Sequence, residues 1–489
     1  MLTWIEQRTG FVSMAKEFLT EDIPGGASYW YVFGSATLFA MILQIATGIF
    51  ITFFYAPSAN TAWESTDAMY HNGFQHFVLS VHSWGASAMI ALVFLHMLQV
   101  IIWGAYKSPR ELQWIVGVLL FIVTLVLGLT GYLLPWDMNA YFASQVAINI
   151  SGTAPVLGPA VQEFLQGGAV MGTLTINRFF GIHVWLMPIA LLGLVGAHLA
   201  IFRYNGPAGP VTDDRRGLKI GKFFPDQVFM DTVVSFAVFF IIVMLSLFAP
   251  PGLDAKADPT NASFVPYPAW YFLSLFGLLA IMPPSLELVG TIIIPTLAII
   301  GLMLLPWLDR STVRSFGSRA PILWITTISI IGVVALSIWS QMGILQKQAA
   351  AAAGGGGTPA AAAPAAPASS GNTASAPSGG AAAPGAGSKV YANNCSTCHG
   401  AAGAGVPGAF PPLAGNAYVT GDKAKVIGVL LNGLHGSISV NGQTYNGQMP
   451  AWKGSLSNKD IADVVTFIRA SWGNTAAAVT EADVTKLAK

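Results

Sequence analysis

The sequence predicts an all-α fold, with a transmembrane bundle of about seven helices and a small α-helical domain on a flexible linker. Of 489 residues, 54% are hydrophobic and only 9% are charged, a composition typical of integral membrane proteins. Seven apolar runs are long enough to cross a bilayer. An uncharged run of Ala, Gly, Pro and Ser then separates them from a C-terminal segment of ordinary composition. The net charge of +1, without a basic run, gives no indication of nucleic-acid binding.

The apolar runs divide the membrane part into three segments. In residues 1–28, apolar residues such as Trp4, Phe11 and Phe18 alternate with charges, which predicts a helix lying on the membrane surface. We expect the first four spans to form one domain over 29–210 and the last three another over 211–347. The predicted spans are 29–54, 77–104, 114–134, 179–202, 229–249, 287–306 and 321–343.

The distribution of lysine and arginine predicts the orientation in the membrane. Most of these residues in the membrane part, such as Arg8, Lys107 and Arg310, lie in the N-terminal segment and in the loops on the same side. Cytoplasmic loops carry such an excess, so we expect a cytoplasmic N-terminus. An odd number of spans then places everything after residue 343 outside the cytoplasm. We expect the protein to be integral to a bacterial cytoplasmic membrane.

Four histidines lie in two of the apolar runs at matched spacing. His82 and His96 are fourteen residues apart, and His183 and His198 are fifteen apart. Fourteen residues of helix rise about 21 Å and return to nearly the same face. If the two helices are antiparallel neighbours, His82 meets His183 near the outer surface and His96 meets His198 near the inner one. Each pair of imidazoles can bind one b-type haem iron, with no position left open, which suits electron transfer.

A simpler alternative is that each histidine is a buried polar residue between helices. Four at matched spacing argue against this, because polar groups at bilayer depth are costly and usually functional. Glycines with the same fourteen-residue step also support two haem sites, because they let haem edges approach the helix backbones. These glycines are Gly34, Gly48, Gly117 and Gly131.

The C-terminal domain carries a motif for covalent haem. Residues 348–388 form the linker, whose composition cannot bury a core, and residues 389–489 form the domain. Within it Cys395, Cys398 and His399 make a C-x-x-C-H motif, typical of a c-type haem with two thioether bonds and an imidazole ligand. Zinc would need a second cysteine pair, and the chain has only these two cysteines. Covalent haem is attached outside the cytoplasm, in agreement with the predicted orientation.

The second axial ligand of this haem is expected downstream. Met449, followed by Pro450, is the first candidate, because a thioether suits low-spin haem and raises its potential. His435 is the second candidate, in a glycine-rich loop. The domain resembles a small class I cytochrome c, in which a methionine and a final amphipathic helix, here about 458–472, hold these places.

Residues 1–345 resemble cytochrome b of the cytochrome bc complexes. The seven spans, the fifteen-residue step and the sequence PWD are similar to the chloroplast-type branch, although both halves are continuous here. That branch holds an extra haem on a cysteine where this chain has Val32, so we expect no such haem. The matching stretches are QIATG (44–48), SVHSW (80–84), PRELQW (109–114), GYLLPWD (131–137), RFFGIH (178–183) and PAWYF (268–272).

The resemblance implies a subunit of a quinol:cytochrome c oxidoreductase. Quinol would be oxidised near the outer haem and quinone reduced near the inner one. A separate Rieske iron–sulfur subunit would take one electron, because this chain has no further cysteines. The tethered c domain would pass that electron to a soluble cytochrome c or a terminal oxidase. The resemblance also implies a homodimer surrounded by lipid.

The outer quinol site departs from the family pattern. The family carries Pro-Glu-Trp-Tyr or its aspartate version, whereas this chain has Ala269 in the acidic position. Another carboxylate could accept the quinol proton, water could carry it, or the site does not split the two electrons. Glu287, at the outer end of the sixth span, is our first candidate base, although a solvated charge at a helix start explains this residue better. The other carboxylates considered are Asp137, Asp254 and Asp258, and the residues expected to shape the pocket are Tyr132, Pro135, Trp136, Trp270 and Tyr271.

At the inner quinone site, Asp231 is the expected proton donor. Arg203 and Lys222 could steady the charge of a partly reduced quinone, and Arg110 and Arg203 could pair with haem propionates. Helix capping or pairing with lipid headgroups explains these residues nearly as well. Two rival functions also stay open. One is a quinol dehydrogenase that sends both electrons one way, and the other is a passive haem conduit without a quinone site.

Overall fold

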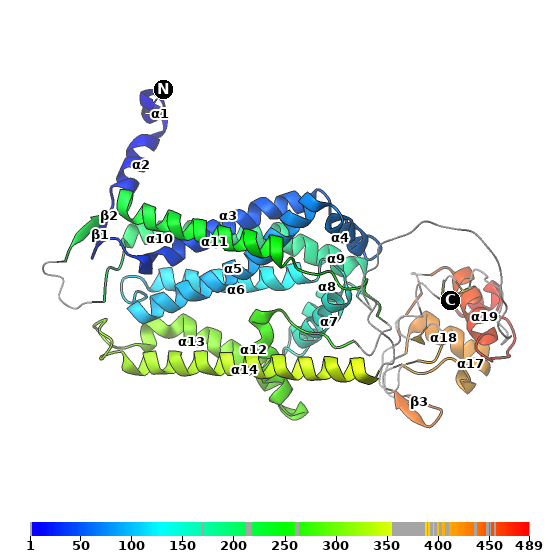
Figure 1. Ribbon diagram of the computed structural model, residues 1–489. Helices are drawn as coiled ribbons and strands as arrows, with labels where there is room; N and C mark the ends of the chain where they lie inside the picture. Colours follow the sequence, from blue (N-terminus) through cyan, green and yellow to red (C-terminus); the bar gives the residue numbers. More distant parts are fainter. Residues whose placement is uncertain are drawn as a thin grey trace. The chain divides into compact units, whose positions relative to one another are not determined.

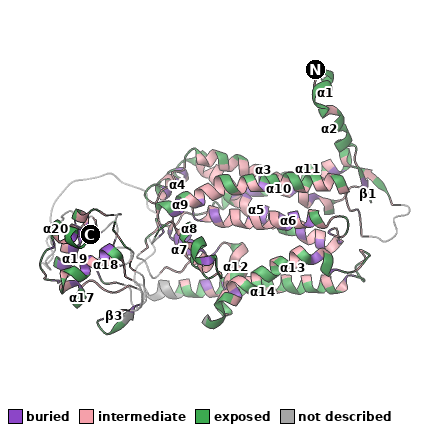
Figure 2. Cartoon of the chain, turned by 180° about the vertical axis from the view of Figure 1, so that it is seen from behind, coloured by how far each residue is buried: buried purple, intermediate pink, exposed green. Residues whose placement is uncertain are grey.

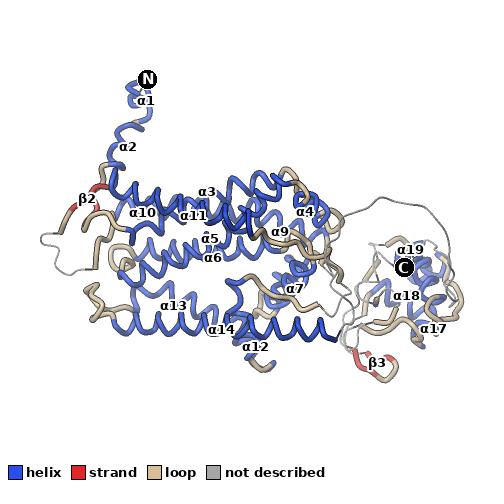
Figure 3. The backbone as a smooth tube through the Cα atoms, viewed as in Figure 1, coloured by secondary structure: helices blue, strands red, loops and turns tan. Residues whose placement is uncertain are grey.

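The computed structural model describes residues 2–168, 171–211, 218–259 and 264–354, together with much of the C-terminal domain. There the described residues are 387–388, 390–391, 395, 399–400, 403–405, 410–434, 438–445, 449, 451–453 and 456–488. The chain separates into two compact units, one of Met1–Ala257 with Phe264–Gly355 and the other of Asp258–Ser263 with Gly356–Lys489. The predicted all-α class is confirmed, since strands are few and short in both units (Figures 1 and 3).

Seven described helical segments are long and apolar enough to cross a membrane, as the sequence predicts. The fourth span combines α9 (Thr173–Gly181), η2 (Ile182–Leu186) and α10 (Met187–Asn205). The helices of the other spans are α3 (Val32–Thr52), α5 (Gly73–Trp103), α6 (Glu111–Tyr132), α11 (Val228–Phe248), α13 (Ile294–Leu308) and α14 (Ala320–Gly354).

The first four spans pack around an apolar core. Helix α3 packs on α5, and α6 packs on α10. Ala36 and Ala40 of α3 are fully buried with Met89 and Leu92 of α5 and Leu191 of α10. Small residues at these contacts let the helix backbones approach closely, which is how helices associate in lipid. By contrast, α14 turns large apolar side chains outward over much of its length (Figure 2), as expected for a lipid-facing helix.

Short elements connect the spans. α4 (Ala62–Tyr70), α7 (Met138–Gly152) and α8 (Gly158–Gln166) join spans on one end of the bundle. η1 (Tyr29–Tyr31) precedes α3, η3 (Phe223–Gln227) precedes α11, and η4 (Trp270–Phe272) leads into α12 (Leu273–Ile281), which packs on α14. η5 (Pro284–Leu286) and η6 (Val289–Ile293) then lead into α13.

The N-terminal segment differs from the single surface helix that we predicted. It forms α1 (Leu2–Thr9) and α2 (Phe11–Leu19), because Gly10 between them adopts a left-handed conformation with φ 63°. A small antiparallel sheet follows, in which β1 (Asp22–Pro24) pairs with β2 (Ile220–Lys222). This pairing joins the start of the first span to the start of the fifth. Apolar periodicity does not show strands of three residues.

The fourth span contains a local change of helix type. Residues Ile182–Leu186 form a π-helical turn that begins one residue before His183. At about 100° per residue, a regular helix of fifteen residues would turn about 60° beyond four full turns. A π turn takes up one additional residue. The step from His183 to His198 therefore matches the fourteen-residue step from His82 to His96.

In the second unit, four described helices surround an apolar core. They are α17 (Ala417–Thr420), α18 (Lys423–Asn432), α19 (Asn458–Ala470) and α20 (Glu481–Leu487), with a hairpin of β3 (Ile438–Val440) and β4 (Gln443–Tyr445). Ile427, Leu431, Ile461 and Val464 are almost fully buried at the centre. Helix α19 begins where predicted, capped by Ser457, and ends two residues earlier than predicted. The seventh span is helical through Gly354, beyond the expected linker start at residue 348, because alanine favours helix.

Candidate functional site

The four histidines form two facing pairs inside the bundle. The rings of His82 and His183 (the first pair) have centroids 6.3 Å apart and planes inclined by 78°. The rings of His96 and His198 (the second pair) have centroids 6.4 Å apart and planes inclined by 76°. Two metal–imidazole bonds of about 2 Å, added to the radii of two five-membered rings, give a separation of about 6 Å. Each pair therefore fits one metal atom bound by both rings.

Hydrogen bonds fix which ring nitrogen of the first pair can bind a metal. His183 Nδ1 lies 3.1 Å from the carbonyl oxygen of Leu127, to which it donates. His82 Nδ1 lies 2.9 Å from Thr47 Oγ1. The Thr47 hydroxyl donates its own proton to the carbonyl of Leu43 at 2.7 Å, so its oxygen accepts from the ring. Both Nε2 atoms therefore keep their lone pairs, which is the tautomer that a metal ligand requires.

The four predicted glycines each lie against one of these histidine rings. The glycines therefore make room directly for the histidine rings, which pass the backbone of α3 or α6 at these positions. Sequence spacing alone predicts haem edges there. A Cβ atom added to the glycine would lie 2.6 Å from His183 Cε1 at Gly131, 3.2 Å from His82 Cε1 at Gly48, 3.3 Å from His96 Cε1 at Gly34, and 3.5 Å from His198 Cε1 at Gly117.

These features together fit a bis-imidazole haem at each pair. The donor set is two neutral imidazoles, the surroundings are apolar, and glycine leaves room where the rings pass the neighbouring helix. The two pairs lie fourteen residues apart along α5. Such sites offer no open coordination position for a substrate, so their chemistry would be electron transfer.

In the second unit, His399 and Met449 are both placed against the apolar core. His399 is buried, and its Nδ1 lies 2.9 Å from the carbonyl oxygen of Pro411, which leaves Nε2 as the ligand atom. Burial lowers the pKa of His399, which favours the neutral ring that binds metal. Met449 packs on the core and forms a backbone bridge with Leu434. Cys395 is buried, while Cys398 and His435 lie outside the described residues.

The predicted pocket residues of the quinol site lie where α6 ends and η4 begins. Trp136 is buried, adopts a left-handed conformation with φ 53°, and packs edge-on against Tyr141 at 5.3 Å, and Pro135 directly precedes it. Trp270 Nε1 donates to Ser87 Oγ at 3.3 Å. The Tyr271 ring lies so close to Gly128 of α6 that an added Cβ would be 2.8 Å from its hydroxyl oxygen. Elements far apart in sequence thus bring aromatic rings together.

Polar groups beside these rings form a hydrogen-bonded cluster. The Tyr132 hydroxyl donates to the carbonyl of Tyr267 at 3.2 Å and accepts from the Asn139 amide. Asn139 Oδ1 in turn accepts from the backbone N–H of Tyr267 at 3.0 Å. Asp137 caps α7, and its other oxygen accepts from the backbone N–H of Asp254 at 3.2 Å. Nothing in the local sequence around Asn139 or Tyr267 distinguishes these residues, so their place in the cluster could not be predicted.

The remaining proton-acceptor candidates lie elsewhere. Glu287 is exposed between η5 and η6. Asp258 belongs to the second unit, whereas Asp254 belongs to the first. Asp137 and Asp254 are therefore the two predicted carboxylates that the structure places beside the aromatic residues.

The residues predicted for the inner site have protein partners. Asp231 Oδ1 accepts from Gln227 Nε2 at 2.9 Å near the start of α11. Arg203 forms an ion pair with Glu21, and Lys222 forms one with Asp22. The Arg110 guanidinium donates to the backbone carbonyls of residues 205–207 at 3.2–3.4 Å. The two ion pairs join the segment before the first span to the end of the fourth span and the loop after it, and Arg110 joins the loop before the third span to the same region. Sequence spacing does not show these contacts.

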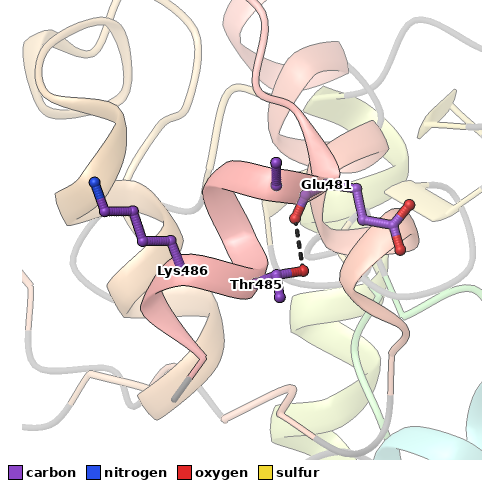
Figure 4. Close-up of a pocket in the computed structure, with 4 residues that line it drawn as sticks. Glu481, Thr485 and Lys486 are labelled. Carbon is purple, nitrogen blue, oxygen red and sulfur yellow. Dashed lines mark hydrogen bonds between the residues drawn. The ribbon is translucent and has the colours of Figure 1, made fainter.

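A buried ionic cluster lies outside the predicted sites. Arg319 is fully buried and donates to Asp309 Oδ2 at 3.0 Å, and Lys107 lies 2.9 Å from the same oxygen. The Tyr106 hydroxyl also donates to it at 2.5 Å. The cluster joins the end of the second span to the loop between the last two. A shallow hollow in the C-terminal domain, lined by Glu481, Thr485 and Lys486 among others (Figure 4), contains none of the predicted residues.

Comparison with known proteins matches three family models along the chain. A model described as cytochrome b (N-terminal)/b6/petB matches residues 87–256, and one described as cytochrome b (C-terminal)/b6/petD matches residues 256–353. A cytochrome c model matches residues 385–472. The three matches follow one another along the sequence.

Several relatives and a solved structure are similar to the membrane part. The menaquinol:cytochrome c reductase cytochrome b subunit of Geobacillus thermodenitrificans is 41% identical over 217 residues, which is 42% of this chain and 97% of the relative. Cytochrome b of Allochromatium vinosum is 30% identical over 361 residues, 69% of this chain and 87% of the relative. A chain of a hyperthermophilic respiratory complex III superposes with a TM-score of 0.63 at 28% identity, covering 72% of this chain and 95% of that one. The protein belongs to the cytochrome b family and carries a cytochrome c domain after its membrane part.

Proposed function

We propose that this chain is the haem-binding subunit of a membrane quinol:cytochrome c oxidoreductase, with two b-type haems and one c-type haem. The observation that carries the proposal is the pair of facing histidine sites, each with a ring separation that fits one shared metal. The relatives support it, since one is named a menaquinol:cytochrome c reductase subunit and the structural neighbour is a respiratory complex III.

Different residues serve the outer and the inner end of the bundle. His82 with His183, and His96 with His198, hold one haem each, and haem supplies a one-electron carrier when bound. The aromatic residues Trp136, Trp270 and Tyr271 shape a quinol pocket beside the first pair, which we place at the outer surface. At the inner end, Asp231 supplies a proton to quinone, with Arg203, Lys222 and Arg110 as nearby cations.

The second electron of quinol needs a separate acceptor. Both cysteines of this chain belong to the c-type motif, so we propose a Rieske iron–sulfur subunit as the partner. Cys395, Cys398, His399 and Met449 would hold the haem of the c domain. This domain would receive the high-potential electron and pass it to a soluble cytochrome c or a terminal oxidase. The assembly is proposed to be a homodimer in the bacterial cytoplasmic membrane, with the c domain outside.

Purification of the native complex tests this function. Pyridine haemochrome spectra should show two b haems for each c haem, and peptide identification should show an iron–sulfur companion. Quinol should reduce the b haems. A complex with one b haem or none, or one whose b haems quinol does not reduce, would contradict the proposal.

Ala269 favours one alternative, a quinol dehydrogenase that sends both electrons the same way. The two functions differ when the inner site is inhibited. With quinol present, a pulse of oxidant then over-reduces the b haems only if the two electrons of quinol take separate routes. Absence of this extra reduction would favour the alternative.

A further inference from the structure

The quinol pocket lacks a carboxylate where the family carries one, yet two carboxylates lie beside it. Ala269 is two residues after Tyr267, whose backbone is held by both Tyr132 and Asn139. Asp254 precedes this stretch, and its backbone N–H donates to Asp137 Oδ2 at 3.2 Å. We propose that Asp254, with Asp137 and Tyr267 beside it, accepts the proton that quinol releases at this pocket. The inference rests on the proposed quinol oxidation and names its proton acceptor.

The two aspartates have different surroundings. Asp137 accepts from the backbone N–H of Ala140 at 2.8 Å and from that of Asp254, so both of its oxygens hold the fold in place. Burial, followed by the neighbouring charge of Asp254, raises the pKa of Asp137. Because its two oxygens accept from backbone N–H groups, Asp137 is a positioning residue that holds the backbone of Asp254 beside the start of α7.

Tyrosines surround Asp254 on the side of the pocket. Burial, followed by the charges of Asp254 and Asp137, raises the pKa of Tyr267 to about 12. Burial, followed by the charges of Asp137 and then Asp254, likewise raises the pKa of Tyr70 on α4 to about 12. Both hydroxyls therefore stay protonated at neutral pH. The Tyr267 hydroxyl is hydrogen-bonded to Asp254, whereas the Tyr70 hydroxyl donates to the carbonyl of Gly252 at 3.2 Å. Tyr132 at the end of α6 and Lys256, whose backbone bridges to that of Asp137, are further titratable residues beside the two aspartates.

Other acids near this end of the bundle are poorer acceptors. Glu64 forms an ion pair with Lys256, whose hydrogen bond holds the pKa of Glu64 below its usual range. Glu287 is exposed, between η5 and η6. Asp254 is half-buried, and its backbone N–H donates to Asp137 next to the aromatic residues.

The protons and the electrons of quinol go to separate acceptors. The O–H bond of quinol breaks, and an O–H bond forms on the Asp254 carboxylate. The two electrons would leave separately, one to the proposed iron–sulfur partner and one to the haem that His82 and His183 would hold. Asp254 then releases its proton to water before it accepts the second one. General base catalysis of this kind contributes about 10²–10⁴-fold to a rate.

The test uses the intact complex with the substitution Asp254→Asn. We expect quinol oxidation to fall by about 10²-fold or more, as expected for loss of a general base. In the unchanged protein the rate should rise with pH as the acceptor loses its proton, and the variant should lose this rise. Asp254→Glu should restore both the rate and the pH profile, and Tyr267→Phe should shift the profile with a smaller loss of rate.

Controls separate this inference from the proposed function and from misfolding. Glu163→Gln, at an exposed carboxylate on α8, is the matched control and should leave the rate unchanged. Haem content and b-haem potentials, measured in every variant, should match those of the unchanged protein.

An unchanged rate and pH profile in Asp254→Asn would overturn the inference, as would loss of the pH dependence in Glu287→Gln alone. If Asp254→Asn fails to assemble, the profiles of Asp254→Glu and Tyr267→Phe decide, and unshifted profiles overturn it. An unchanged protein that does not oxidise quinol would instead overturn the proposed function.

Discussion

Replacing Gly131 by alanine should disturb the first histidine pair. The matched replacement of Gly117 should disturb the second pair less. The added Cβ would lie 2.6 Å from His183 Cε1, whereas ordinary contact begins at 3.4 Å. The ring would have to move by about 0.8 Å or the helices would have to separate, and such overpacking costs about 1–3 kcal/mol. Alanine gains about 1 kcal/mol of helix propensity over glycine, so the clash outweighs it.

The ring cannot move away without a loss. His183 Nδ1 donates to the Leu127 carbonyl at 3.1 Å, and moving the ring weakens this bond. A net cost of about 1–2 kcal/mol corresponds to roughly 5- to 30-fold weaker retention of the bound group. We therefore expect Gly131→Ala complexes to lose part of one b haem, from two per c haem toward one.

Pyridine haemochrome spectra and redox titration of the purified complex measure this effect. Gly117→Ala is the matched control at the second pair, because its Cβ would lie 3.5 Å from His198 Cε1, within ordinary contact distance. Gly193→Ala controls for the helix itself, because nothing lies within 4 Å of its Cβ position. If Gly131→Ala keeps both b haems at unchanged potentials, the histidine rings do not hold haem in the geometry described.

Three further changes test the structure. Thr47→Val removes the acceptor of the His82 Nδ1–H group, and loss of such a partner should weaken binding of one b haem by about 10- to 100-fold, measured by haem retention on dilution. Arg319→Leu removes one of the two cations paired with the buried carboxylate of Asp309, and Lys107 stays as the other. The change should destabilise the membrane part by about 1.5–3 kcal/mol in thermal unfolding, as for loss of a hydrogen bond to a charged group, against little change for an exposed arginine. Hydrogen bonds from a lysine and from the Thr480 cap lower the pKa of Asp483 to about 2, below its unfolded value of 3.8. The stability that Asp483 contributes is therefore complete above about pH 4 and is lost as the pH falls toward 2. In acid unfolding, Asp483→Asn should be less stable than the unchanged protein above about pH 4, and this difference should disappear toward about pH 2.

The spans and the facing of the histidines could be predicted because both depend on local periodicity. A bilayer requires long apolar helices, and one helix face repeats after fourteen residues, so His82 and His96 share a face whatever surrounds them. The pairing partners on the fourth span followed from antiparallel packing of neighbouring spans. The helix bounds in the structure differ from the predicted ones mainly where alanine or an isolated glycine acts, as at Gly10 and beyond residue 348.

The surroundings of the sites could not be predicted, because they depend on contacts between distant segments. Thr47 fixes the tautomer of His82 across two helices, and a threonine in an apolar helix usually only bonds its own backbone. By sequence, Arg319 resembles the other positively charged loop residues, yet it is fully buried against Asp309. By sequence Glu287 is the first candidate and Asp254 one of three others, and only the fold places Asp254 beside the aromatic pocket and leaves Glu287 exposed.

The unequal histidine steps have a physical cause that is visible in the sequence once the structure is known. The π turn Ile182–Leu186 ends two residues before Pro188, and a second π turn, Val289–Ile293, ends two residues before Pro295. Proline has no N–H, and its ring collides with the carbonyl four residues earlier in a regular α-helix. A π turn moves that carbonyl aside and takes up one residue more. Pro188 thus accounts for the π turn beside His183. The fifteen-residue step is then the spacing that keeps His183 and His198 facing their partners on α5.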